Sequence, residues 1–163
     1  MGFYWRLDES TGLKVYMGFP TGKKPWVSKP RVVQKAHKTM NLFYKAGLSP
    51  EPMGIQRVYV ALGMPKDVKP DTVIDTPWAL RMQHIHYDEN KWFDYAMGRP
   101  YAWGEERDHC PEGFLDFVSK VKAFQKQHKI KLSAATWKTD EVPKLGDVMW
   151  CTKKERFYLV DVD

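Results

Sequence analysis

Apolar and polar side chains alternate along two short runs near the N-terminus. The runs cover residues 2–7 and 13–19, and a period of two is typical of half-buried strands. Residues 8–12, with the sequence DESTG, separate them and are rich in turn-forming residue types. The pattern predicts a β-hairpin over residues 2–19.

Two later segments carry a helical period. In residues 31–46 apolar side chains recur every three or four positions, and Gly47 and Pro50 then predict the end of the helix. The predicted buried face of this helix is Val33, Ala36, Met40 and Phe43. A second helix is expected after Pro111, a residue type that suits a first helical turn. Its predicted buried face is Phe114, Phe117, Val118, Val121, Phe124 and His128.

Four more strands complete the predicted chain. Residues 55–62 and 78–86 are apolar runs on either side of a polar loop rich in proline and aspartate. Residues 147–151 and 156–161 predict a closing hairpin around residues 152–155. The order β-β-α-β-β-α-β-β indicates an α+β domain with small antiparallel sheets and two main helices.

Length and composition place the chain among ordinary globular domains. Its 163 residues are the length of one domain. With 43% hydrophobic and 28% charged residues, the composition excludes a chain that is disordered throughout. No apolar run approaches the ~20 residues of a membrane helix, so we expect no membrane association. The N-terminal residues lack a signal-peptide pattern, and we expect a cytoplasmic protein.

The net charge of +6 is unevenly distributed. Residues 1–50 hold nine basic and two acidic residues, and residues 118–138 hold six lysines and no acid. The segments between and after them are net acidic. Basic blocks of this kind either bind nucleic acid or phosphate, or form the solvated faces of two helices.

Taken in order, these segments resemble the protein-kinase-like fold in its small-molecule and phage-encoded variants. The opening GFYWRLDESTGLKVY is similar to the first kinase hairpin, and YKAGLSPEP to the segment after the family's regulatory helix. The run WALRMQHI resembles the strand that leads into the hinge, and FLDFVSKVKAFQKQHKI the long helix before the catalytic loop. LGDVMW together with KKERFYLVDVD resembles the metal-binding hairpin.

The resemblance implies a reduced kinase-like domain over residues 1–163, with residues 1–86 as an N-lobe and 87–163 as a truncated C-lobe. Lys14 would then be the ATP-binding lysine, and Asp147 and Asp161 would hold Mg²⁺ with their carboxylates. We expect Lys14 and Asp161 to face one cleft. Asp140 would be the catalytic base, and a phage-encoded member would act in the host cytoplasm.

Three departures from the kinase pattern argue against phosphoryl transfer. A kinase lysine pairs with a glutamate of the following helix, yet residues 10–50 contain no acidic residue. No His-Arg-Asp catalytic loop precedes Asp147, and no activation segment follows Asp161. We therefore expect a degenerate, pseudokinase-like regulatory protein that binds a protein partner. The alternatives are an ATP- and Mg²⁺-dependent kinase and a basic nucleic-acid-binding protein.

Two segments are candidates for partner binding. Residues 92–103 are dense in aromatic side chains, and Trp92, Arg99, Tyr101 and Trp103 are of the types that anchor protein partners or stack on bases. The alternative is that these aromatics fill a core. Lys122 and Lys126 belong to the second basic block and are candidates for phosphate contacts.

Histidines on one predicted strand raise the question of a metal. His84 and His86 would share one face of the strand, and His109 and Cys110 could complete a zinc site. The alternative is two half-buried strand histidines with no metal. No second ligand pair with fixed spacing supports the zinc site.

Overall fold

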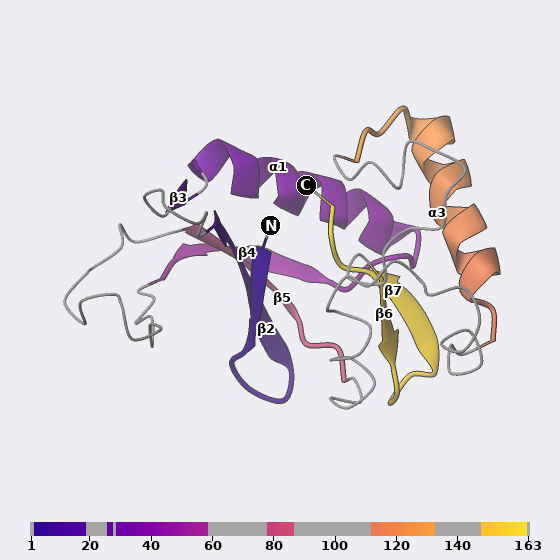
Figure 1. Cartoon of the computed structure of the whole chain (residues 1–163), viewed down its shortest axis with the longest axis horizontal. Coiled ribbons are helices and arrows are strands. Elements are labelled where there is room, and N and C mark those ends of the chain that lie inside the picture. The colour runs from indigo at the N-terminus through magenta and orange to yellow at the C-terminus, as the bar shows by residue number, and fades with distance from the viewer. Residues whose placement is uncertain are drawn as a thin grey trace. The chain divides into compact units, whose positions relative to one another are not determined.

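A computed structural model of the chain describes residues 2–18, 26–27, 29–58, 78–86, 112–132 and 148–162 (Figure 1). Within them the fold is α+β, with two helices and small antiparallel sheets, as predicted. The chain divides into two compact units. The first consists of Met1–His37 and Pro52–His84, and the second of Lys38–Glu51 and Ile85–Asp163.

The first unit is built on an antiparallel sheet of five strands. They are β1 (Gly2–Arg6), β2 (Thr11–Gly18), β3 (Trp26–Val27), β4 (Pro52–Arg57) and β5 (Trp78–Gln83). The spatial order is β1-β2-β5-β4, and β3 pairs with the far end of β2. The predicted N-terminal hairpin is confirmed, whereas the short strand β3 has no counterpart among the predictions.

The turn between β1 and β2 is organised by one carboxylate. Oδ1 of Asp8 accepts hydrogen bonds from the backbone N–H of Ser10 at 2.7 Å and of Thr11 at 2.8 Å. The Ser10 hydroxyl donates a third at 2.9 Å. These bonds, with the Ser10 N–H first among them, lower the pKa of the Asp8 carboxyl because they favour its charged form. The arrangement is an Asx-type turn, which explains why the DESTG segment ends the first strand.

Tyr4 of this hairpin is half-buried and packs against the buried His84. Tyr4 and His84 share a hydrogen bond of 2.6 Å between Oη and Nδ1, and their rings stack with a 6.0 Å centroid distance. The backbone N–H of His84 also donates to the carbonyl of Ser10 at 2.8 Å. Tyr4 pairs with Lys14 across the hairpin, so its ring reaches diagonally over Gly12. Only a residue without a side chain leaves room for that ring.

The bounds of two predicted strands are wrong. The strand expected at residues 55–62 begins at Pro52 and ends at Arg57, with a bulge between Pro52 and Gly54 that accommodates the exposed Met53. Gly54 has φ 123°, a backbone conformation that glycine adopts readily and other residues rarely do. The bulge therefore forms at the glycine of this strand. The strand predicted at residues 78–86 ends at Gln83, so His84 and His86 do not lie on one strand face.

Helix α1 (Pro30–Lys45) confirms the predicted helix at 31–46. Its predicted face of Val33, Ala36, Met40 and Phe43 is fully buried. The helix ends in a Schellman motif, because Leu48 N–H donates to the Phe43 carbonyl at 2.9 Å and Gly47 N–H to the Tyr44 carbonyl at 2.8 Å. Gly47 has φ 74°, which a glycine adopts without strain. The residues of α1 up to His37 belong to the first unit and the rest to the second.

The second unit also contains α3 (Phe114–His128) and a hairpin of β6 (Val148–Cys151) and β7 (Arg156–Leu159). Both were predicted from the sequence. Four of the six side chains expected on the apolar face of α3 are buried, and Phe124 is half-buried. His128 is exposed, which corrects the prediction. Its ring packs on Phe124 at a centroid distance of 4.2 Å, so it covers the edge of the core and does not enter it.

Neither of the two helices in the described part of the chain combines the length and the apolar character needed to cross a bilayer.

The close approach of Tyr4 to Gly12 makes a testable prediction. Gly12→Ala should destabilise the protein by about 1–3 kcal/mol, because the new Cβ overlaps the Tyr4 ring and displaces it from His84. In a Tyr4→Ala background the same change should be neutral, or stabilising by up to about 1 kcal/mol. Urea unfolding of the four variants measures the coupling, and equal costs in both backgrounds would contradict this account.

Candidate functional site

The β6–β7 hairpin is attached to the turn that ends α1. The Leu159 N–H donates to the Leu48 carbonyl at 2.8 Å, and a guanidinium nitrogen of Arg156 donates to the Gly47 carbonyl. The same guanidinium lies over the ring of Tyr158, 4.9 Å from its centroid. A cation at the C-terminal end of a helix is favoured by the exposed carbonyls and the helix dipole. Arg156 therefore connects the hairpin to α1 within the second unit.

Phe157 is the centre of an aromatic cluster on the other side of the hairpin. It contacts Trp150 edge-on at a centroid distance of 4.7 Å, Phe114 at 5.4 Å and Phe117 at 5.8 Å. Phe157 thus links Phe114 and Phe117 of α3 to Trp150 of the hairpin in one apolar cluster. Edge-to-face pairs of this kind contribute about 0.5–1.5 kcal/mol each beyond the area they bury. The cluster fixes the hairpin against the start of α3.

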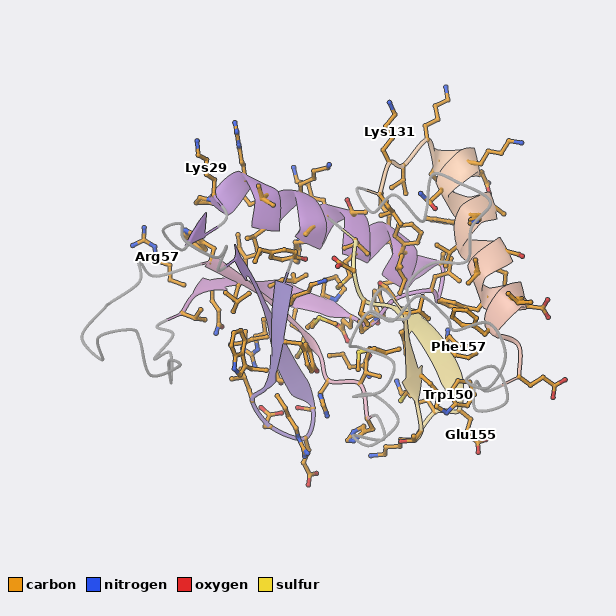
Figure 2. The ribbon with its side chains drawn as sticks, in the orientation of Figure 1. Lys29, Arg57, Lys131, Trp150, Glu155 and Phe157 are labelled. Atoms are coloured by element: carbon orange, nitrogen blue, oxygen red, sulfur yellow. The ribbon has the colours of Figure 1, made fainter. Side chains whose placement is uncertain are left out.

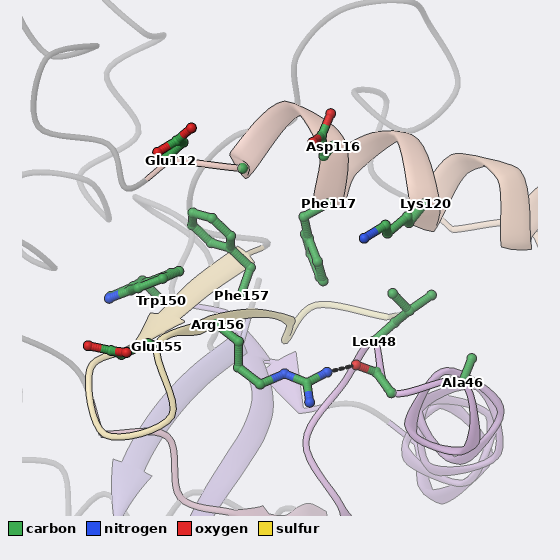
Figure 3. Close-up of a pocket in the computed structure, with 12 residues that line it drawn as sticks. Ala46, Leu48, Glu112, Asp116, Phe117, Lys120, Trp150, Glu155, Arg156 and Phe157 are labelled. Atoms are coloured by element: carbon green, nitrogen blue, oxygen red, sulfur yellow. Dashed lines mark hydrogen bonds between the residues drawn. The ribbon is translucent and has the colours of Figure 1, made fainter.

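These contacts leave a pocket of about 460 Å³ in the second unit (Figure 3). It is lined by the turn after α1 at residues 46–48, the start of α3 at residues 112–120, and the hairpin at residues 150–157. Phe117, Trp150 and Phe157 supply its aromatic wall. In Figure 3 the rings of Trp150 and Phe157 lie between the carboxylates of Glu112 and Glu155. This volume is within the range of small-ligand sites, about 300–1,000 Å³.

The charges that line the pocket are unequal. Glu112, Asp116 and Glu155 bring three carboxylates, against Lys120 and Arg156. All five residues are exposed at the rim. Arg156 is engaged by the Gly47 carbonyl and the Tyr158 ring, which leaves Lys120 as the cation not held in this way. Three carboxylates against two cations leave the lining with a net charge of −1.

The pocket has the chemistry of a binding site and lacks that of a metal centre. Within the described residues, no group of three or more His, Cys, Asp or Glu side chains is close enough to hold a metal ion. Its aromatic wall and exposed carboxylates suit recognition by packing and charge.

Lys14 is the predicted ATP-binding residue that the structure describes most fully. It lies in β2, opposite Tyr4 on one side and Leu80 of β5 on the other, and it is only 7% exposed. Its ammonium group lies 5.3 Å from the centre of the Tyr16 ring. A buried lysine is uncommon, since removing an ammonium group from water is costly unless it is compensated. Its burial distinguishes it from the many exposed lysines of the chain.

The acidic residues predicted for the same site are described only in part. Asp161 follows β7 in the second unit and is half-buried, with the buried Val160 and Val162 on either side. Asp147 and Asp140 lie outside the described residues. Lys14 belongs to the first unit and Asp161 to the second, so the cleft expected between them stays a prediction.

The predicted partner-binding residues divide in the same way. Trp92, Arg99, Tyr101 and Trp103 lie outside the described residues, as do His109 and Cys110. Lys126 is exposed on α3, whereas Lys122 is half-buried.

His84 is buried in the first unit against Tyr4, and His86 in the second unit accepts two hydrogen bonds from Thr152 through its carbonyl. The two histidines therefore do not share one face of a strand, which was the basis of the predicted zinc site.

The pocket residues were missed by the sequence analysis. Glu112 and Asp116 were assigned to a net acidic segment, and Trp150 and Phe157 only to strands. The spacing of these residues, some forty apart along the chain, gives no local signal. The one local clue in the sequence is a block of four charged residues, 153–156, directly before Phe157 and Tyr158 in the closing hairpin.

Comparisons with known proteins do not assign the chain to a family. No protein-family model matches it, and neither the curated proteins nor the solved structures gave a significant match.

The role of Arg156 can be tested by unfolding. Arg156→Ala should lower the free energy of unfolding by about 0.5–1.5 kcal/mol, because the Gly47 carbonyl loses a charged donor at the end of α1. Lys154→Ala, in the exposed turn just before Arg156, is the matched control and should change the free energy of unfolding by less than about 0.5 kcal/mol. Chemical denaturation measures both, and equal effects would refute a specific role for Arg156.

Proposed function

We propose that this chain is a catalytically silent, kinase-like protein that regulates a protein partner by binding it in the cytoplasm. The kinase-like frame rests on the sequence resemblance, and the binding role rests on the aromatic segment at residues 92–103. Phosphoryl transfer is the alternative from the enzyme class. A basic nucleic-acid-binding protein is the alternative from the binding class.

The order of elements in the first unit supports the kinase-like frame. Lys14 lies in β2, and β2 pairs antiparallel with β5, the strand that resembles the one leading into a kinase hinge. Helix α1 follows β2 and β3 along the chain and precedes β4, which is where the regulatory helix of a kinase is expected. The buried position of Lys14 is consistent with a special role for this lysine.

The absence of any acidic residue from α1 is the observation that carries the silent assignment. In active kinases a glutamate of this helix holds the lysine in place for the ATP phosphates. The sequence of α1 is PRVVQKAHKTMNLFYK, and its buried residues are Val33, Ala36, Thr39, Met40 and Phe43. Gln34, the nearest polar substitute in the sequence, is exposed. The helix therefore offers no carboxylate for Lys14.

Nucleotide binding separates the silent protein from a working kinase. A protein that binds ATP with the ligand at about 100 times its Kd gains about 2.7 kcal/mol, which raises the Tm of a chain of this size by about 5–10 °C. We expect ATP with Mg²⁺ to shift the Tm by less than about 1 °C. Phosphate transfer to a generic protein substrate should stay far below the ~1 s⁻¹ of slow kinases.

Two lysine variants serve as controls in this experiment. Lys14→Met removes the predicted phosphate contact, and Lys35→Met changes an exposed lysine of α1 in the same way. A large ATP-dependent shift that survives in Lys35→Met and disappears in Lys14→Met would establish a nucleotide site at Lys14. Phosphate transfer at ~1 s⁻¹ in addition would overturn the silent assignment.

The lysines of α3 favour nucleic acid as the second candidate. Lys120 and Lys126 are exposed on the helix, and Lys129 and Lys131 are exposed just beyond its end. In Figure 2 the Lys131 side chain extends away from the ribbon. A cluster of lysines can bind phosphates through summed contacts, with an affinity that falls steeply as salt rises.

Two variants distinguish a protein partner from nucleic acid. Trp103→Ala should abolish retention of the partner from a host lysate, because a few aromatic anchors dominate protein interfaces. Lys122→Glu with Lys126→Glu should leave that retention unchanged while removing any binding to DNA or RNA. Binding is compared at two salt concentrations after circular dichroism confirms the fold. Loss of DNA or RNA binding alone, with no partner retained by the parent protein, would favour the nucleic-acid candidate.

A further inference from the structure

We infer that the pocket between the turn after α1, the start of α3 and the β6–β7 hairpin binds a single arginine or lysine side chain presented by a peptide segment. This inference deepens the proposed function, on which it rests, by assigning a chemical feature to the protein partner. The inference is based on the aromatic side chains and the carboxylates that line this one pocket.

The aromatic wall is suited to a cation. Trp150 is half-buried and packs edge-on against the buried Phe157, which holds the indole in one orientation. Tryptophan has the aromatic face that attracts an ammonium or guanidinium group most strongly. The pocket of about 460 Å³ is open to solvent, so a bound cation keeps part of its water and this attraction is modest. Figure 2 places Trp150, Glu155 and Phe157 together at the hairpin.

The carboxylates supply the complementary charge. Glu112 and Glu155 lie on opposite sides of the Trp150 and Phe157 rings in Figure 3. No described residue forms an ion pair or hydrogen bond with the side chains of Glu112, Asp116 or Glu155. A guanidinium placed on the indole would therefore meet carboxylates that have no competing partner within the described structure.

The same charges disfavour an anion in the pocket. The start of a helix attracts phosphate or carboxylate through its open N–H groups. Here Asp116 occupies the first turn of α3 and Glu112 precedes it, so negative charge already compensates that end. Lys120 lies on the opposite side of Phe117 from Glu112 in Figure 3, so the cation nearest α3 is set apart from that carboxylate, while Arg156 is held by the Gly47 carbonyl. A nucleotide or an acidic peptide is accordingly the wrong class of ligand.

The probe for this site is a five-residue peptide with one arginine between glycines and serines, acetylated and amidated to remove the terminal charges. Titration into the ¹⁵N-labelled full chain should shift the Trp150 indole N–H resonance and backbone amides of residues 112–120 and 150–157. We expect a Kd of about 1–10 mM for one side chain. The lysine peptide should bind at a similar concentration. A citrulline peptide, which keeps the shape and loses the charge, should not bind.

Paired variants test the role of the carboxylates. Glu112→Gln with Glu155→Gln should weaken binding about three- to tenfold, because two charge partners are lost without a change of size. Glu9→Gln with Glu51→Gln makes the same charge change at exposed positions outside the pocket and should bind like the parent. Trp150→Leu should also weaken binding about three- to tenfold, and thermal unfolding checks that each variant is folded.

Three results would overturn the inference. They are no shift with either cationic peptide up to about ten times the expected Kd, equal binding of the citrulline peptide, and equal binding by the Glu112→Gln, Glu155→Gln variant. Shifts with a glutamate peptide alone would also overturn it and would assign the pocket to anions. Free guanidinium ion as a further ligand distinguishes a site for any organic cation from one that needs the peptide. Failure here leaves the ATP test of the silent kinase-like frame unaffected, so the two proposals fail separately.

Discussion

The β6–β7 hairpin depends for its attachment on the turn that ends α1. A helix leaves its last carbonyl groups without partners inside the helix. The Schellman motif satisfies those of Phe43 and Tyr44, and the carbonyls of Gly47 and Leu48, just beyond the helix, accept hydrogen bonds from the hairpin. Leu159 and Arg156 donate to them. The turn that ends the helix therefore also holds the hairpin, and both the aromatic cluster and the pocket depend on the position of the hairpin.

Local patterns were sufficient where one element buries its own face. The helical period predicts the two ends of α1 to within one residue. The four residues that it places on the buried face are all fully buried. The two hairpins were predicted because their turns and alternation lie close together in the sequence. The α+β class follows from these elements. A kinase-like arrangement of them is a stronger statement, and it rests on the resemblance and not on these patterns.

Sequence reasoning failed where a property arises from distant residues. The strand β5 ends at Gln83, and the next residue, His84, is bonded to Ser10 and Tyr4, some seventy to eighty positions away in the chain. His128 fits the helical period of α3 but lies beyond the buried part of its face. The pocket joins residues from three separate segments, so none of its carboxylates or aromatic rings is distinguished by its neighbours in the sequence.

The division of α1 between the two units has a consequence for synthesis on the ribosome. Met40 and Phe43 emerge early, but Phe124 and the hairpin that complete their unit are made roughly 80 to 115 residues later, on the order of ten seconds at typical elongation rates. During that interval the second half of the helix has an apolar face and no completed core. The nascent chain therefore exposes this apolar helix face, which favours aggregation, until the rest of the second unit has been synthesised.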